Sequence, residues 1–130
     1  MIEFYAYDLL TGKITKTGII LPGFSPDVSR KNKIVFGKQT DSKHYHNLET
    51  DSLELRPILN INDITIIVEQ EYNPLNIPAG TIVNVDDEDV GIVDNTGLIL
   101  VFPVAKTYKL QLKPPFPYFE KTITIEVITE

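Results

Sequence analysis

Apolar and polar residues alternate along most of this chain with a period of two residues. Val, Ile, Thr, Tyr and Phe recur in the alternating stretches, and no window of about a dozen residues keeps apolar side chains at the i, i+3, i+4, i+7 spacing of a helix. Nine prolines and seven glycines interrupt the alternation at short intervals, as is typical of short strands joined by turns. The pattern predicts an all-β fold.

Two β-hairpins are expected in the first half. Residues 2–7 and 13–20 are the strands of the first, joined by a turn in which Asp8 bonds the backbone and Gly12 takes a positive φ. The same skeleton, an Asx residue followed by Leu, a variable position and Thr, returns at Asn47–Thr50. A second hairpin with the same turn chemistry is therefore expected there.

The second half reads as an antiparallel β-sandwich. Ile64–Val68 is a continuous apolar run suited to a central strand. Further strands are predicted at residues 81–85, 90–93, 106–112 and 122–127. We place the boundary so that residues 1–63 form the hairpin region and residues 64–130 the sandwich. The proline-containing stretch Glu69–Asn76 is the other candidate boundary, but a sandwich that starts after it has few strands to cover its core.

Composition excludes several classes of protein. The absence of cysteine rules out disulfides, thiol catalysis and cysteine-based zinc sites. The net charge is −6, and residues 68–130 carry ten of the eighteen acidic residues but four of the twelve basic ones. An acidic surface repels phosphate backbones, so nucleic acid is not an expected partner. No apolar run is long enough to span a bilayer, and the first residues lack the features of a signal peptide, so we expect synthesis in a cytoplasm and no membrane partner.

His44 and His46 are the only histidines. On a strand they project to the same face, so both could bind one metal ion with Asp41 or Asp51 as a third ligand. The alternative is a solvated hairpin face, with Tyr45 packed inward. We favour the alternative because no further histidine or cysteine completes a zinc site.

The acidic run Asp86–Asp89 offers several carboxylates within one turn, which suits Ca²⁺. It lacks the alternating ligand spacing of calcium loops, and we favour an exposed hairpin tip. No metal or cofactor is expected. The chain also has no glycine-rich phosphate loop, nucleophile elbow or zinc-protease motif, and we do not expect an enzyme.

Aromatic residues gather near both ends of the chain. The segment Pro114–Phe119 is the densest. We favour the interpretation that Phe116 and Phe119 cap the open end of the core while the prolines block edge pairing. The alternative is that exposed aromatic rings stack on a glycan or fill a groove on a neighbouring subunit. The residues expected at an interface are Phe4, Tyr5, Tyr7, Ile14, Phe116, Tyr118 and Phe119.

Two resemblances rest on these motifs. Ile77–Thr81, Val90-Gly91 and Thr107–Leu110 resemble the PEGA-type repeat, an Ig-like β-sandwich of surface and envelope proteins. Its turn glycine is missing, since Asp87 and Glu88 stand there, which predicts a longer hairpin than in that family.

The whole chain is similar to small proteins encoded by tailed bacteriophages near their tail-fibre or virion genes. The elements that carry this similarity are Tyr7–Gly12, His44–Asn47, Arg56-Pro57, Ile77–Thr81 and Phe116–Tyr118. The resemblance implies a structural protein of the virion, made in the host cytoplasm, that contacts other virion proteins and is present as a homo-oligomer or in many copies. We expect a decoration, tail or fibre-associated protein that docks through the hairpin Ile2–Ile20. The alternatives are a carbohydrate-binding module that adsorbs to a host-surface glycan through Tyr118 and Phe119, and a chaperone for fibre assembly.

Overall fold

The computed structural model describes all residues from 1 to 130 and confirms the all-β prediction, with 48% of residues in strands and none in helices. No helix is long and apolar enough to cross a membrane. The strands are β1 (Ile2–Asp8), β2 (Ile14–Ile20), β3 (Asn32–Phe36), β4 (His44–Asn47), β5 (Ser52–Leu55), β6 (Ile64–Ile67), β7 (Glu71–Tyr72), β8 (Ile82–Val85), β9 (Glu88–Ile92), β10 (Leu100–Val101), β11 (Lys106–Lys113) and β12 (Lys121–Ile128).

The chain divides into an N-terminal unit, Met1–Arg56, and a C-terminal unit, Pro57–Glu130. This division falls before the boundary after residue 63 that the sequence suggested. Leu59 and Ile61 explain the difference, because both are buried in the core of the C-terminal unit. The linking segment therefore belongs to the second unit although it forms no strand.

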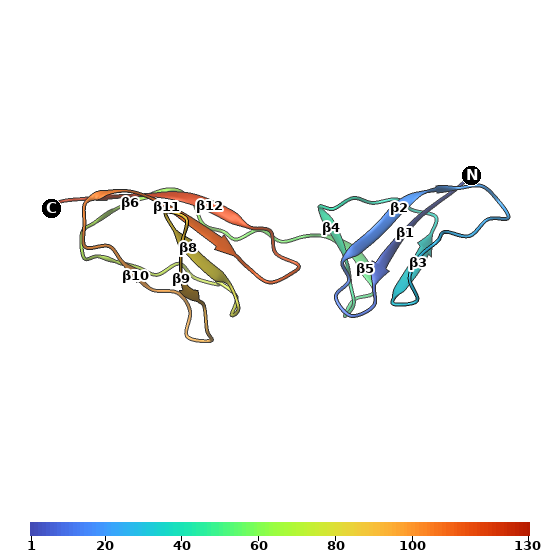
Figure 1. The fold of residues 1–130 in the computed structure, drawn as a ribbon, viewed down its shortest axis with the longest axis horizontal. Coiled ribbons are helices and arrows are strands. Elements are labelled where there is room, and N and C mark those ends of the chain that lie inside the picture. Colours follow the sequence, from blue (N-terminus) through green and yellow to red (C-terminus); the bar gives the residue numbers. More distant parts are fainter. The chain divides into compact units, whose positions relative to one another are not determined.

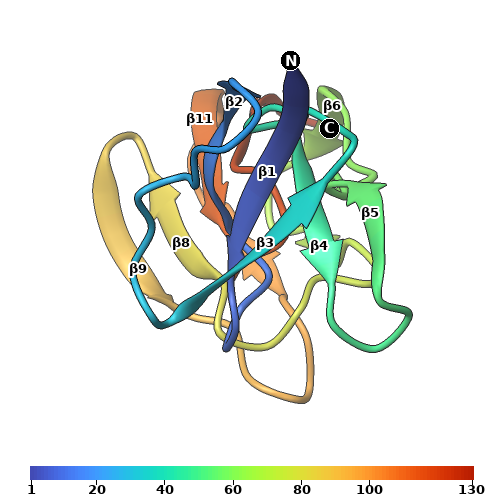
Figure 2. The ribbon, with the colours of Figure 1, turned by 90° about the vertical axis from the view of Figure 1, so that its right-hand side faces the viewer.

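A three-stranded antiparallel sheet forms the N-terminal unit, with β1 between β2 and β3. Four consecutive residues of β1, Phe4 to Tyr7, are buried, so both faces of this strand are covered. One face packs against the hairpin of β4 and β5, where Tyr5 and Tyr7 contact His46. Figure 2 shows this unit with β1 and β3 in the foreground.

The two hairpin turns of this unit share the predicted chemistry. The Asp8 carboxylate accepts hydrogen bonds from the backbone N–H groups of Leu10 and Thr11. The Asn47 side-chain oxygen accepts the equivalent bonds from residues 49 and 50. Gly12 has a φ of 81°, and Asp51, at the equivalent place in the second turn, has a φ of 53°. The two hairpin turns therefore share their backbone geometry as well as their sequence pattern.

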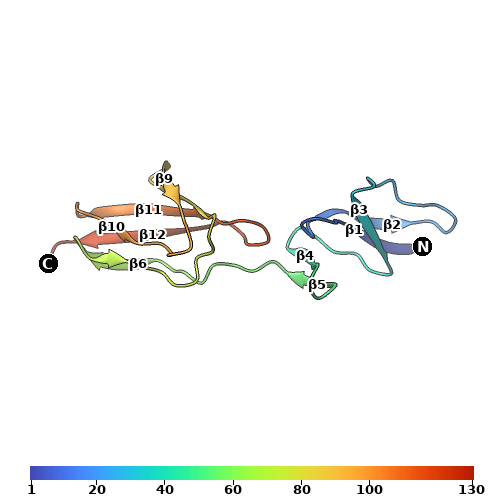
Figure 3. The ribbon, with the colours of Figure 1, turned by 90° about the horizontal axis from the view of Figure 1, so that it is seen from below.

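The C-terminal unit is built on a five-stranded sheet in the order β6-β12-β11-β8-β9 (Figure 1). Its strand pairs are antiparallel except one, because β6 runs parallel to β12. Figure 3 shows these two strands side by side. The expectation of a purely antiparallel arrangement is therefore wrong at this pair. A separate two-stranded sheet joins β7 and β10.

One face of the five-stranded sheet carries the core of the C-terminal unit. Along β12 the residues Ile123, Ile125 and Val127 are buried, and the residues between them are exposed. Leu110 and Leu112 of β11 have no exposed surface, and a buried side chain of this size stabilises a fold by about 1.5–3 kcal/mol. The residues from the other strands and loops that complete this core are Leu59, Ile61, Ile66, Tyr72, Ile77, Val83, Val93, Leu98 and Phe102.

The turn between β8 and β9 is shorter than the missing glycine suggested. Val85 pairs directly with Glu88, so only Asp86 and Asp87 connect the strands. Both have a positive φ, 51° and 68°, as a two-residue type I′ turn requires. Aspartate tolerates this conformation better than most residues, which explains why glycine is dispensable.

Candidate functional site

Three of the aromatic residues expected at an interface are internal. Phe4, Tyr5 and Tyr7 are 5%, 3% and 3% exposed within the N-terminal unit. Their side chains form its core, so the expectation that they contact a partner is revised. The sequence held the signal for this burial, since Phe4–Tyr7 places apolar side chains on both faces of one strand.

The remaining expected interface residues are partly buried. Ile14 begins β2, where it pairs with Tyr7. In the C-terminal unit, Tyr118 packs against the core, and the Phe119 N–H donates to the carbonyl of Pro57. The segment 114–119 is therefore anchored to its own unit through Tyr118 and the Phe119 backbone.

His46 is the most constrained polar side chain of the N-terminal unit. It is 3% exposed, and its ring lies parallel to that of Tyr7 with the centroids 3.8 Å apart. Its Nε2 lies 2.7 Å from Asp51 Oδ1, and its Nδ1 lies 2.9 Å from the Tyr5 hydroxyl. A carboxylate only accepts, so the His46 Nε2–H donates to Asp51, and Nδ1 forms the second hydrogen bond with the Tyr5 hydroxyl.

The environment of His46 shifts the pKa values of two neighbouring side chains, Asp51 and Tyr5. The hydrogen bond from His46 lowers the pKa of Asp51, although this carboxylate is largely exposed. Burial raises the pKa of the Tyr5 hydroxyl above its ordinary value. Sequence periodicity assigned Tyr45 to the interior and His46 to solvent, which is wrong, since His46 is buried and Tyr45 is half-buried.

No metal site forms from these histidines. Both ring nitrogens of His46 already have partners, and His44 Nδ1 lies 2.7 Å from Asp41 Oδ1. No group of three or more potential ligands could hold a metal ion. The His46 cluster ties the hairpin to the sheet, and we assign it a structural role.

The acidic turn is partly neutralised by lysines. Lys106 Nζ lies 2.8 Å from Asp86 Oδ2, and Lys109 Nζ forms an ion pair with Asp87. The hydrogen bond from Lys106 lowers the pKa of Asp86. Two aspartates of the candidate calcium site thus face lysines of β11, while Glu88 and Asp89 form no ion pair.

An apolar patch lies on the N-terminal sheet, on the face opposite the β4–β5 hairpin. Phe36 is the cross-strand partner of Phe4, and Ile20 is the partner of Ile2. Directly opposed residues of antiparallel strands share a face, so these four side chains lie together. Phe36 is 56% exposed and Ile2 is 38% exposed. We call Ile2, Ile20 and Phe36 the N-terminal patch; Ile20 in it is half-buried. Ile2 and Ile20 belong to the hairpin that was expected to dock, whereas Phe36 of β3 was not among the residues expected at an interface.

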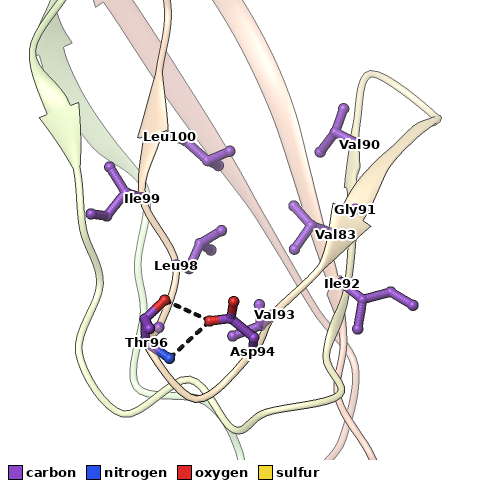
Figure 4. A pocket seen from close by; sticks show the side chains of 11 residues that line it. Val83, Val90, Gly91, Ile92, Val93, Asp94, Thr96, Leu98, Ile99 and Leu100 are labelled. Carbon is purple, nitrogen blue, oxygen red and sulfur yellow. Dashed lines mark hydrogen bonds between the residues drawn. The ribbon is translucent and has the colours of Figure 1, made fainter.

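A groove opens in the C-terminal unit between β9 and the segment 98–100 (Figure 4). Its volume is about 320 Å³. The side chains of Val83, Leu98 and Leu100 point into the space between the two segments, and Val90 borders it from β9. At one end of the groove, the Asp94 carboxylate accepts hydrogen bonds from the backbone N–H and the hydroxyl of Thr96 and so stabilises the turn there.

No protein-family model matches this chain, and comparisons with curated proteins and with solved structures found no match. Its function must therefore be inferred from the surfaces described above.

Proposed function

We propose that this chain is a structural component of a tailed-phage particle, a decoration, tail or fibre-associated protein that acts through protein–protein contacts. The observation that carries the proposal is the N-terminal patch. Exposed aromatic and aliphatic side chains on one sheet face are the kind of surface that a partner protein covers. In the turn that follows β2, Leu21 and Phe24 are also exposed apolar residues, with 57% and 68% of their surface accessible.

Within this proposal the N-terminal unit docks and the C-terminal unit is displayed. The C-terminal unit is then an Ig-like sandwich in which the β7–β10 pair is the second sheet. The packing of Tyr72, Leu98 and Phe102 in one core with the five-stranded sheet supports that interpretation. Eleven of the eighteen acidic residues and four of the twelve basic ones belong to residues 57–130, which favours a solvated position for this unit.

The test substitutes apolar residues of the N-terminal patch and leaves every strand of the unit in place. Deleting residues 1–20 would remove β1, the central strand of the sheet, and would unfold the unit. The double variant I2T/F36T keeps β-forming residues on the same face but removes most of the apolar surface. We expect its incorporation into particles whose genome encodes the chain to fall at least about tenfold, measured by mass spectrometry of purified particles.

The matched control is the double variant L10T/L55T. Leu10 and Leu55 are 87% and 68% exposed but lie in the first hairpin turn and in β5, outside the patch. We expect normal incorporation. Unchanged incorporation of I2T/F36T would contradict the proposal, as would the absence of the wild-type chain from purified particles, which would indicate an assembly chaperone instead.

A further inference from the structure

The outer strand β9 has one edge that no other strand pairs with. It pairs only with β8, and all five of its residues are exposed. A β-bulge at Val90 interrupts this pairing between Val83 and Asn84. Bulges and charges on an edge strand hinder unspecific pairing with other chains. The edge of β9 has both features, but no other segment covers it, so a partner with a matching strand can still pair with it.

Beside this edge lies the groove, with β9 as one wall and the segment 98–100, which leads into β10, as the other. The opposite wall includes β10, which pairs only with β7. Gly91 contributes no side chain to the groove, and a Cβ atom built at this position has no atom within 4 Å. The space in front of Gly91 is therefore open to an apolar side chain from outside. The buried Val83 side chain, 2% exposed, forms the floor.

The charges along the edge determine which partner fits. Asp86 and Asp87 are paired with lysines, whereas Glu88 and Asp89, the first two residues of β9, form no ion pair. Asp89 Oδ1 accepts a hydrogen bond from the Gly91 N–H, which leaves its charge uncompensated. In a parallel pairing with a second copy of this chain, Glu88 and Asp89 of the two β9 strands would lie directly opposite one another, and their repulsion disfavours that arrangement.

We propose that this groove binds an extended segment of a partner protein in which apolar residues alternate with lysine or arginine. The segment adds a strand along β9, with backbone hydrogen bonds to its free edge. Apolar side chains enter the space in front of Gly91 and contact Val90 and Leu100. The cationic side chains project from the other face of the added strand, where Asp89 lies opposite Asn84, and Glu88 adds negative charge at the start of β9. This surface goes beyond the proposed docking patch, so each can be tested without the other.

The experiment uses two synthetic heptapeptides and the full ¹⁵N-labelled chain. One peptide alternates lysine with valine, and the other alternates glutamate with valine. We expect the lysine peptide to shift the amide signals of residues 88–92 and 98–100, and the glutamate peptide to bind at least about tenfold more weakly. Raising the salt from about 0.05 M to about 0.5 M should weaken the lysine peptide's binding.

Charge reversal provides the decisive variant. E88K/D89K should lose at least about tenfold in affinity for the lysine peptide and gain affinity for the glutamate peptide. The control E120K/E130K changes the net charge equally, away from the groove, and should keep the preference of the original chain. Signals outside the groove report whether each variant is folded.

Three outcomes would overturn the proposal. They are equal binding of the two peptides, shifts that avoid β9 and residues 98–100, and an equal effect of E88K/D89K and E120K/E130K. The variant I2T/F36T should retain peptide binding, so failure of the docking proposal and failure of the groove proposal give different results.

Discussion

At the residue scale, positive φ angles decide where the chain can turn. Gly12 was predictable, because glycine is the usual residue for such a turn. Asp51, Asp86 and Asp87 adopt the same conformation without being glycine. The positive φ angles of Asp86 and Asp87 were not expected, because the contacts of their carboxylates come from a distant part of the chain: Asp86 Oδ1 accepts from the Lys109 N–H, and Asp87 forms an ion pair with Lys109 Nζ.

Gly12 is irreplaceable for a second reason. A Cβ atom at this position would lie 1.9 Å from the His46 carbonyl oxygen, while the His46 N–H donates to the Gly12 carbonyl. We expect G12A to cost about 1–2 kcal/mol for the positive φ and a further 1–3 kcal/mol, roughly, for displacing the hairpin. Urea unfolding of the N-terminal unit measures this cost.

The matched control is G23A. Gly23 has a φ of 90° but nothing within 4 Å of a Cβ atom, so only the backbone cost applies. A G12A variant no less stable than G23A would show that the contact with His46 does not constrain the turn.

At the scale of elements, the sequence predicted strands more reliably than the faces they present. Both long strands near the C-terminus, β11 and β12, fall where the alternation placed them. The face of β4 was misassigned because His44, Tyr45 and His46 offer no contrast between apolar and polar. The pairing of His46 with Tyr5 joins residues 41 positions apart, which no local pattern reveals.

The link between the hairpin and the sheet should weaken in acid. Asp51 has a lowered pKa in the folded chain, so it stabilises the N-terminal unit above its ordinary value near 3.8. That contribution disappears as the pH falls through the lowered value. We expect the free energy of unfolding of the wild type to decrease between about pH 5 and about pH 2, and to decrease less in D51N.

Asparagine suits this test because it keeps an oxygen acceptor for His46 and tolerates a positive φ. The variant E49Q removes a neighbouring exposed carboxylate and should keep the wild-type dependence on pH. Superimposable pH profiles for the wild type and D51N would contradict the assigned role of the carboxylate.

At the scale of the whole molecule, the sequence indicated two parts but not their border. Ile64–Ile67 is the first strand of the five-stranded sheet, as expected, yet Leu59 and Ile61 reach into the core of this unit from a segment without strand character. The parallel pairing of β6 with β12 joins segments about sixty residues apart, and alternation within one strand carries no information about such a partner. The patch and the groove were unpredictable for the same reason, because each combines several strands.

The C-terminal unit contains a complete core of its own. We expect a fragment of residues 57–130 to fold alone, with a β-type circular dichroism spectrum and a cooperative thermal transition. A fragment of residues 64–130, which lacks Leu59 and Ile61, should be less stable by about 2–5 kcal/mol or more. Equal stability of the two fragments would place the border where the sequence suggested.

The parallel neighbours β6 and β12 also determine how the C-terminal unit carries mechanical load. Tension applied between the segment that enters β6 and the segment that leaves β12 pulls the two strands past each other along their length. The ladder between them is then loaded in shear, and its hydrogen bonds must rupture together instead of unzipping one after another. The C-terminal unit is therefore expected to resist a force that pulls on the segments before β6 and after β12.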